Sequence, residues 1–94
     1  IIRMAFQPAR AEDFLGHFRR VAPPLRAFPG VRRLELHRDA EQSNVFYTYS
    51  LWDAESDLEI YRESALFRDA WKQAKTWFSA KPRAFSLKQE LVLD

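Results

Sequence analysis

The side chains of this chain that could take part in chemistry are mostly aromatic. The sequence has eight phenylalanines, three tryptophans and three tyrosines, but only two histidines and no cysteine. His17 and His37 lie too far apart in the sequence for a typical zinc-binding spacing. The two glycines, Gly16 and Gly30, cannot form a glycine-rich phosphate loop. We therefore expect no metal, no nucleotide and no thiol chemistry.

The aromatic residues instead suggest a pocket for a flat apolar molecule between a sheet and its helices. Such pockets are lined mainly by apolar side chains, and a few polar groups fix the orientation of the ligand. Tyr49 and Tyr61 could orient such a ligand, and Trp52 and Trp71 could stack on it. His37 is the only histidine in an expected strand, so it is the candidate base. The candidate substrate-binding residues are Phe18, Tyr49, Trp52, Phe67 and Trp71, and the candidate catalytic residues are His37 and Tyr61.

Two helices are expected to position these side chains. The segment 64–78 places Phe67, Trp71 and Phe78 on one side at helical spacing, and Ser64 can cap its first turn. A helix from Arg10 is predicted by the spacing of Phe14, Leu15, Phe18, Val21 and Leu25. Pro23 and Pro24 should kink this helix or start a new turn, and Gly30 should close it with a positive φ. We interpret His17, beside the Phe14 and Phe18 stripe, as a surface or boundary residue.

Four strands complete the predicted fold. Segments 1–6, 31–38, 45–52 and 84–93 are rich in apolar, aromatic or β-branched residues or alternate in polarity. Residues 39–44 form a polar turn between the second and third strands, and Asp53 is the expected N-cap of a short helix that ends near Glu63. The order β-α-β-β-α-β predicts a single α+β domain over residues 1–94 with a ferredoxin-like antiparallel sheet and helices on one face. Since its strands are apolar on both sides, we expect a homodimer that covers the other face.

Charge and composition argue against several other partners. The net charge of +2 is too small to indicate a nucleic-acid partner. RNA-binding domains of this topology stack bases on sheet aromatics, and Phe46, Tyr47 and Tyr49 could do so, but the glycine-containing basic motif they use is missing. Apolar runs are too short for a membrane span or a signal peptide. Without cysteine or an export signal, we expect a cytoplasmic protein.

Several segments together resemble the antibiotic biosynthesis monooxygenase family, also called ABM domains. These segments are FPGVRRLEL, VFYTYSLWDAESDLEIYRESALF and AWKQAK, and their most telling positions are Pro29-Gly30, Trp52 and the pair Ser64 and Phe67. The resemblance covers nearly the whole chain. It implies a dimeric α+β barrel, and several members of the family oxidise phenols or quinols without metal or flavin.

Other members of the family degrade haem, and this chain departs from their pattern. That branch requires an asparagine on the first strand, a tryptophan in the short helix and a histidine in the last helix. The nearest equivalents here are Ile2, Tyr61 and Trp71, so the axial nitrogen is missing. The resemblance therefore implies a monooxygenase that needs no cofactor and acts on a small phenolic or quinol-type aromatic compound. The alternative is a non-catalytic ligand-binding or structural dimer of the same fold.

Overall fold

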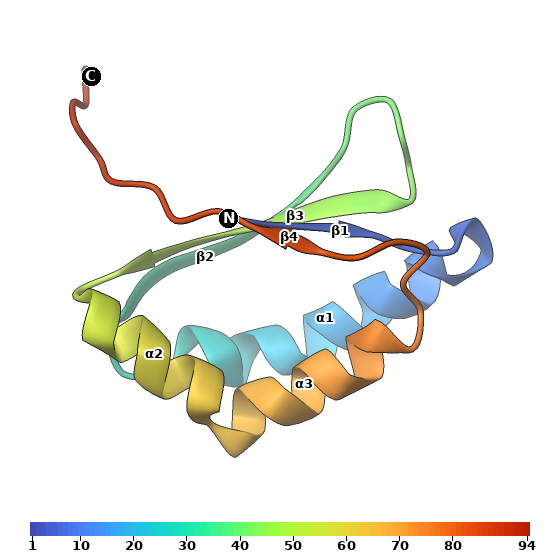
Figure 1. Ribbon diagram of the computed structural model, residues 1–94, viewed down its shortest axis with the longest axis horizontal. Helices are drawn as coiled ribbons and strands as arrows, with labels where there is room; N and C mark the ends of the chain where they lie inside the picture. Colours follow the sequence, from blue (N-terminus) through green and yellow to red (C-terminus); the bar gives the residue numbers. More distant parts are fainter.

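A four-stranded antiparallel sheet forms one layer of the structure, a computed structural model that describes all of residues 1–94. The strands lie side by side in the order β2-β3-β1-β4, and the helices cover one face of the sheet (Figure 1). This arrangement confirms the predicted α+β, ferredoxin-like fold. The strands are β1 Ile2–Ala5, β2 Val31–Arg38, β3 Val45–Trp52 and β4 Arg83–Ala84.

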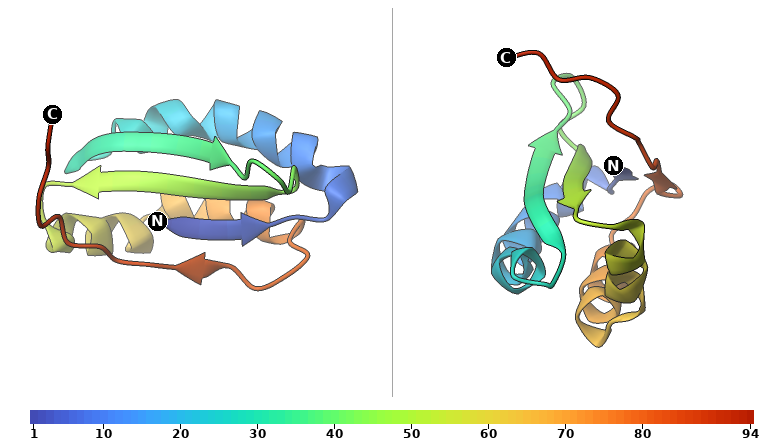
Figure 2. Two further views of the ribbon diagram at one scale, coloured as in Figure 1. Left: turned by 90° about the horizontal axis from the view of Figure 1, so that it is seen from above. Right: turned by 90° about the vertical axis from the view of Figure 1, so that its left-hand side faces the viewer.

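The helices form two rows beneath the sheet. One row is α1, and the other is α2 followed directly by α3, as the end-on view in Figure 2 shows. The short helix ends at Glu63, as predicted, whereas the last helix ends at Lys75, before the predicted Phe78. All of the helices are too short or too polar to cross a lipid bilayer. Their bounds are η1 Pro8–Arg10, α1 Ala11–Arg26, α2 Glu55–Glu63 and α3 Ala65–Lys75.

The hairpin of β2 and β3 has the predicted bounds, and its register decides which residues face the helices. Leu36 pairs with Thr48 and Leu34 with Ser50 on the helix side, while Glu35 pairs with Tyr49. Successive strand residues point to opposite faces, so Tyr49 lies on the side away from the helices. We call this side, which carries Arg33, Glu35, His37, Tyr47, Tyr49 and Leu51, the outer face.

Helix α1 continues through Pro23 and Pro24, so the predicted alternative of a new turn at these prolines is wrong. The carbonyls that would accept bonds from these positions belong to Arg19 and Arg20, which are exposed, so water can replace the missing donors. As predicted, Gly30 follows the helix with a positive φ of 90°. Its carbonyl accepts a hydrogen bond from the Asp53 amide at 2.8 Å, which links the start of β2 to the end of β3.

Ser64 joins α2 to α3. Its hydroxyl donates to the Tyr61 carbonyl at 2.6 Å and accepts from the Phe67 amide at 3.1 Å, so the predicted cap of the long helix is confirmed. The prediction of Asp53 as the N-cap of the short helix is wrong, because Ala54 holds that position and no side chain caps the helix. Asp53 instead lies near Arg32, with 3.4 Å between the two charged groups.

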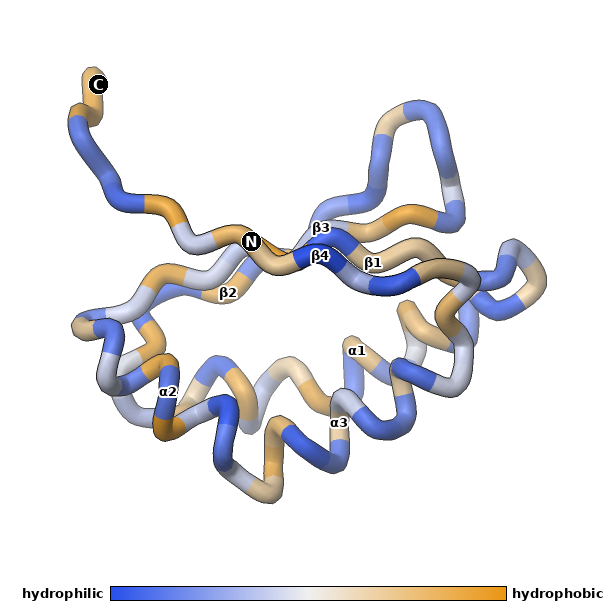
Figure 3. The backbone as a smooth tube through the Cα atoms, in the orientation of Figure 1, coloured by the Kyte–Doolittle hydropathy of each residue, from blue (hydrophilic) through white to orange (hydrophobic).

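The last predicted strand, 84–93, is reduced to two paired residues. Ala84 pairs with Ile2 and Arg83 with Arg3, and the Phe85 amide donates to the Ile1 carbonyl at 2.7 Å. Residues 86–94 form no further strand, and they leave the sheet on the side opposite the helices (Figure 1). Figure 3 shows that this segment carries apolar residues away from the body of the protein.

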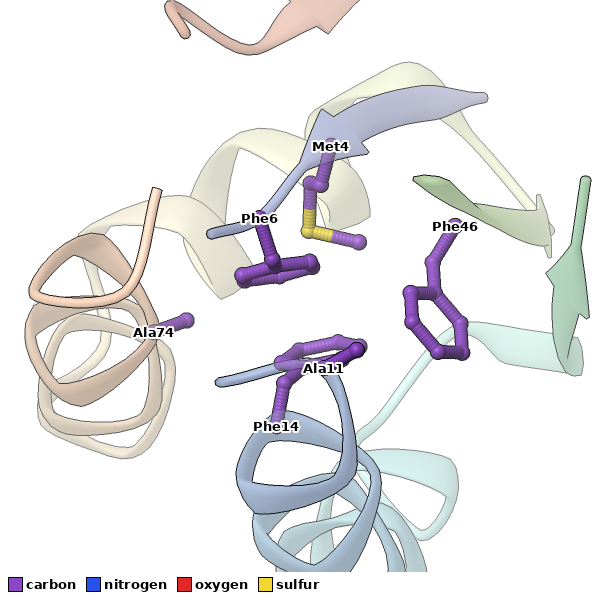
Figure 4. Close-up of a cluster of buried hydrophobic side chains, with 6 residues drawn as sticks. All are labelled: Met4, Phe6, Ala11, Phe14, Phe46 and Ala74. Carbon is purple, nitrogen blue, oxygen red and sulfur yellow. The ribbon is translucent and has the colours of Figure 1, made fainter. Parts of the chain in front are cut away.

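The tightly packed core lies at one end of the space between the layers. Phe6 stacks on Phe14 with 4.1 Å between ring centroids, and Phe46 meets Phe14 edge-on at 5.2 Å. Figure 4 shows these rings between β1, β3 and the start of α1. Towards the other end of β3 the side chains become half-buried. The core cluster comprises Met4, Phe6, Ala11, Phe14, Phe46 and Ala74.

Candidate functional site

A cavity of about 290 Å³ lies between the sheet and the helices, beyond the packed core. Its volume is near the lower end of the range for small-molecule sites. Leu34 and Ser50 line it from the sheet, Phe18 from α1, and Trp71 from α3. Phe85, at the start of the C-terminal segment, also borders it. The space is therefore enclosed by elements from both halves of the chain and is large enough for a small aromatic ring system.

Aromatic rings form a continuous wall along α2 and α3. Trp52 contacts Tyr61 with 4.8 Å between ring centroids, and Tyr61 contacts Phe67 at 4.9 Å. Phe67 then stacks on Trp71 at 5.7 Å with an interplanar angle of 19°. Phe28 meets the other side of Tyr61 at 5.3 Å. Because each ring is held by its neighbours, the wall presents a firm apolar surface to a planar ligand.

The structure brings most of the predicted site residues to this cavity. Phe18, Trp52, Tyr61, Phe67 and Trp71 all line it. They come from α1, β3, α2 and α3, so the fold gathers side chains that are distant in the sequence. The helical spacing of 64–78 placed Phe67 and Trp71 on the sheet-facing side, and the structure agrees.

Two predicted site residues, His37 and Tyr49, lie on the outer face. They border a separate, more open hollow there, together with Glu35 and Tyr47. The predictions that His37 acts as a base in the cavity and that Tyr49 binds substrate there are wrong in placement. Tyr49 alternates with Thr48 and Ser50, and those two residues take the cavity side. Aromatic character suggested a pocket residue, but strand alternation puts this ring on the opposite face.

His37 is part of a small charged cluster. Its Nε2 lies 2.7 Å from the Glu35 carboxylate, which also bonds the Arg33 guanidinium. These contacts lower the pKa of Glu35 from its usual value, and the hydrogen bond with His37 has a larger effect than the one with Arg33. The cluster is exposed and far more typical of a solvated strand surface than of a catalytic base.

Tyr61 lines the cavity and has a perturbed ionisation. Burial raises the pKa of its hydroxyl to about 12, because the anion is poorly solvated among the surrounding rings. The Ser64 hydroxyl bonds the backbone carbonyl of Tyr61, and the phenolic hydroxyl makes no hydrogen bond within the protein. Tyr61 therefore stays protonated at neutral pH and can donate a hydrogen bond to a ligand oxygen.

Two small polar residues of β3 also line the cavity, and the sequence reasoning did not single them out. They are Thr48 and Ser50. The Trp52 indole donates to the Ser50 hydroxyl at 3.0 Å, which fixes the indole ring and leaves the hydroxyl hydrogen of Ser50 available. Thr48 and Ser50 alternate with Tyr47 and Tyr49 along β3, and this alternation is the signal in the sequence that could have identified them as cavity residues.

His17 lines the cavity as well, although we interpreted it as a surface or boundary residue. Its Nε2 lies 3.0 Å from the Ala70 carbonyl, so it links α1 to α3, and its ring meets Trp77 edge-on at 5.8 Å. His17 follows Phe14 by three residues and precedes Val21 by four, which places it on the buried stripe of the helix. That spacing could have revealed it. No group of three or more His, Asp or Glu side chains is arranged to hold a metal ion.

Known proteins share this fold. A structure from Bordetella bronchiseptica, named as a candidate antibiotic biosynthesis monooxygenase, has a TM-score of 0.84 at 22% identity, over 96% of this chain and 93% of that one. A second, from Nitrosomonas europaea and named likewise, has a TM-score of 0.82 at 16% identity, over 87% and 79% of the two chains. A third, from Caulobacter crescentus, has a TM-score of 0.81 at 20% identity, over 87% and 78%. At these identities the likeness shows the fold.

A search among proteins with curated descriptions finds no match. The family model described as antibiotic biosynthesis monooxygenase, however, matches residues 1–73, which include β1 to β3, α1, α2 and most of α3. These elements build the sheet, the aromatic wall and most of the cavity. The chain belongs to the antibiotic biosynthesis monooxygenase family.

Proposed function

We propose that this protein is a monooxygenase that oxidises a small phenolic or quinol-type compound without a cofactor. The observation that carries the proposal is the aromatic cavity with a free, protonated Tyr61 hydroxyl at its wall. A planar phenol fits a space of about 290 Å³. Its ring can pack on Trp52, Phe67 and Trp71, while its oxygen accepts a hydrogen bond from Tyr61.

The reaction needs an electron-rich ring, dioxygen and a place for one proton. Loss of the phenolic proton gives an anion that can transfer one electron to dioxygen. The resulting radical pair combines at a ring carbon, and the peroxide formed loses water to leave a quinone. The balance is phenol plus dioxygen to quinone plus water, so one oxygen atom enters the product and the other leaves as water.

The cavity supports each stage of this chemistry. An apolar wall keeps water away from the radical pair, which protects it from side reactions. Tyr61 can donate to the phenolate oxygen and stabilise the charge that develops there. Its raised pKa suits a donor rather than a proton acceptor. Ser50 and Thr48 offer further polar contacts that can orient a second oxygen of a quinol.

Oxygen uptake tests the proposal. A panel of phenols and quinols is offered to the protein in metal-free buffer with isotopically labelled dioxygen. We expect substrate-dependent uptake and one labelled oxygen atom in the quinone product. Saturable binding of the panel without any uptake would contradict the enzymatic proposal and support the alternative, a non-catalytic ligand-binding dimer.

Assembly as a homodimer is part of the same proposal. It is supported by the half-buried aromatic residues of the outer face and by exposed leucines in the C-terminal segment. The chain has no cysteine, which suits the reducing cytoplasm that we propose as its compartment.

A further inference from the structure

We infer that His17 is the general base that takes the phenolic proton in the proposed reaction. This inference rests on the proposed function, because it assigns a residue to the one proton transfer which that reaction needs. The sequence offers only two histidines, and only His17 lines the cavity. His37 lies on the outer face and borders a different hollow.

The hydrogen bond to α3 fixes the protonation of the His17 ring. A backbone carbonyl only accepts hydrogen bonds, so the Nε2 atom, 3.0 Å from the Ala70 oxygen, must carry the hydrogen. In the neutral imidazole the other nitrogen, Nδ1, then holds a free lone pair. Nδ1 is therefore the basic atom of this side chain, and the contact with Trp77 and the bond to Ala70 hold the ring in place.

The other titratable groups of the cavity cannot do this task. Tyr61 keeps its proton because its pKa is raised to about 12. Arg62 also lines the cavity, but its guanidinium offers only N–H donors and no acceptor for a proton. Histidine is also the side chain that most often accepts a proton near neutral pH in enzymes.

The proton transfer balances within the site. The phenolic O–H bond breaks and an Nδ1–H bond forms, so a neutral phenol and a neutral imidazole become a phenolate and an imidazolium. The imidazolium keeps the hydrogen bond from its Nε2–H to the Ala70 carbonyl. Tyr61 donates to the phenolate from the aromatic wall. The anion then reacts with dioxygen as in the proposed function.

The first experiment compares His17→Gln with His37→Gln. Glutamine can still donate an N–H to the Ala70 carbonyl but cannot act as a base, so the link between α1 and α3 is preserved. We expect the turnover of His17→Gln to fall by roughly 10²–10⁴-fold, with little change in substrate affinity. His37→Gln should stay within about twofold of wild type. Wild-type turnover in His17→Gln would overturn the inference while leaving the proposed function intact.

A second readout needs no turnover. A nitrophenol is added at a pH below its own pKa, and the phenolate absorbance band is followed. We expect the band to appear with wild type and with His37→Gln but not with His17→Gln. Absence of the band with wild type, or equal bands for all three proteins, would refute the role of His17. If the band behaves as expected and no compound of the panel is oxygenated, the proposed oxygenation fails and the assignment of His17 stands.

A measurement on the unmodified protein avoids any effect of substitution on folding. The nitrogen NMR signals of the two histidines report which ring nitrogens are protonated. For His17 we expect a free Nδ1 and a protonated Nε2 without ligand, and two protonated nitrogens once the nitrophenol is bound. An Nδ1 that stays unprotonated in the complex would contradict the inference.

Discussion

At the scale of single residues, Tyr61 differs from the other tyrosines in its surroundings. Rings pack on it from Phe28, Trp52 and Phe67, and this burial raises its pKa to about 12. The folded-state pKa lies above that of an unfolded chain, about 10. The contribution of the buried, neutral Tyr61 hydroxyl to the free energy of unfolding is therefore complete below pH 10 and is lost as the pH rises towards 12.

An alkaline titration followed by tyrosine absorbance tests this. We expect one of the three tyrosines to ionise last, near pH 12. The substitution Tyr61→Phe should remove this late component, because no other tyrosine sits among those rings. The control Tyr47→Phe, on the outer face, should retain it. A late component that persists in Tyr61→Phe would show that burial of Tyr61 is not its cause.

The site residues show where sequence reasoning succeeds and where it stops. Phe67 and Trp71 could be placed because a helical stripe has one buried side. Tyr49 could not, because β3 has large residues on both faces and composition alone does not tell which face meets the helices. His17 is half-buried, which agrees with its interpretation as a boundary residue, but its bond to the Ala70 carbonyl could not be predicted because it depends on how α1 and α3 pack.

At the scale of elements, the two glycines have opposite roles. Gly16 lies inside α1, and a Cβ there would lie 3.5 Å from the Arg20 guanidinium, an ordinary contact. Gly30 has a φ of 90°, and a Cβ there would come within 2.5 Å of the Asp57 side chain. Gly30 thus allows the start of β2 to approach α2 closely, whereas Gly16 only weakens its helix.

Alanine at each position should therefore have effects of opposite sign. We expect Gly16→Ala to raise the free energy of unfolding by roughly 0.5–1 kcal/mol, since alanine favours a helix interior. Gly30→Ala should lower it by about 1–3 kcal/mol or more, from the strained backbone and the clash. Chemical denaturation of the two variants beside wild type measures both changes. Equal effects, or a stable Gly30→Ala, would contradict the geometry at this turn.

The elements also differ in how well the sequence predicted them. Strands β2 and β3 have their predicted ends, because their alternation is bounded by Gly30, the polar loop and Asp53. The length of the last strand was overestimated. Alternating apolar residues indicate which side chains a strand would bury, but not whether a neighbouring strand is present to pair with it. Helix α1 continues past the prolines where a new turn was one of the predicted outcomes, and the two residues that lose a donor there, Arg19 and Arg20, are exposed to water.

At the scale of the whole molecule, packing is uneven between the layers. The fully buried residues Phe6 and Phe46 lie at one end, and the half-buried Trp52 and Trp71 lie around the cavity. A chain of 94 residues buries limited surface. An occupant of the cavity would therefore add apolar contacts that the protein alone lacks.

The outer face leaves apolar surface without a cover. Tyr47, Tyr49 and Leu51 line its hollow together with the charged cluster around Glu35. The C-terminal segment rises on this side of the sheet (Figure 1), and its Leu87 and Leu93 are 71% and 84% exposed. In water such surface is unfavourable. A second copy packed sheet to sheet would cover both the face and the segment.

This leads to a test of assembly with a matched pair of variants. We expect wild type to sediment as a dimer at micromolar concentration, and Tyr49→Lys to raise the dissociation constant at least about tenfold, because an unpaired charge is costly at an apolar interface. The folded protomer should tolerate this lysine, since Tyr49 lies opposite Glu35 in the register. Ile60→Lys, at an apolar residue that is 62% exposed on α2, should leave the dimer unchanged, because the helices cover the other face of the sheet. A stable folded monomer of wild type would contradict the dimer. A dimer that is lost in Ile60→Lys and kept in Tyr49→Lys would place the interface on the helices instead of the outer face.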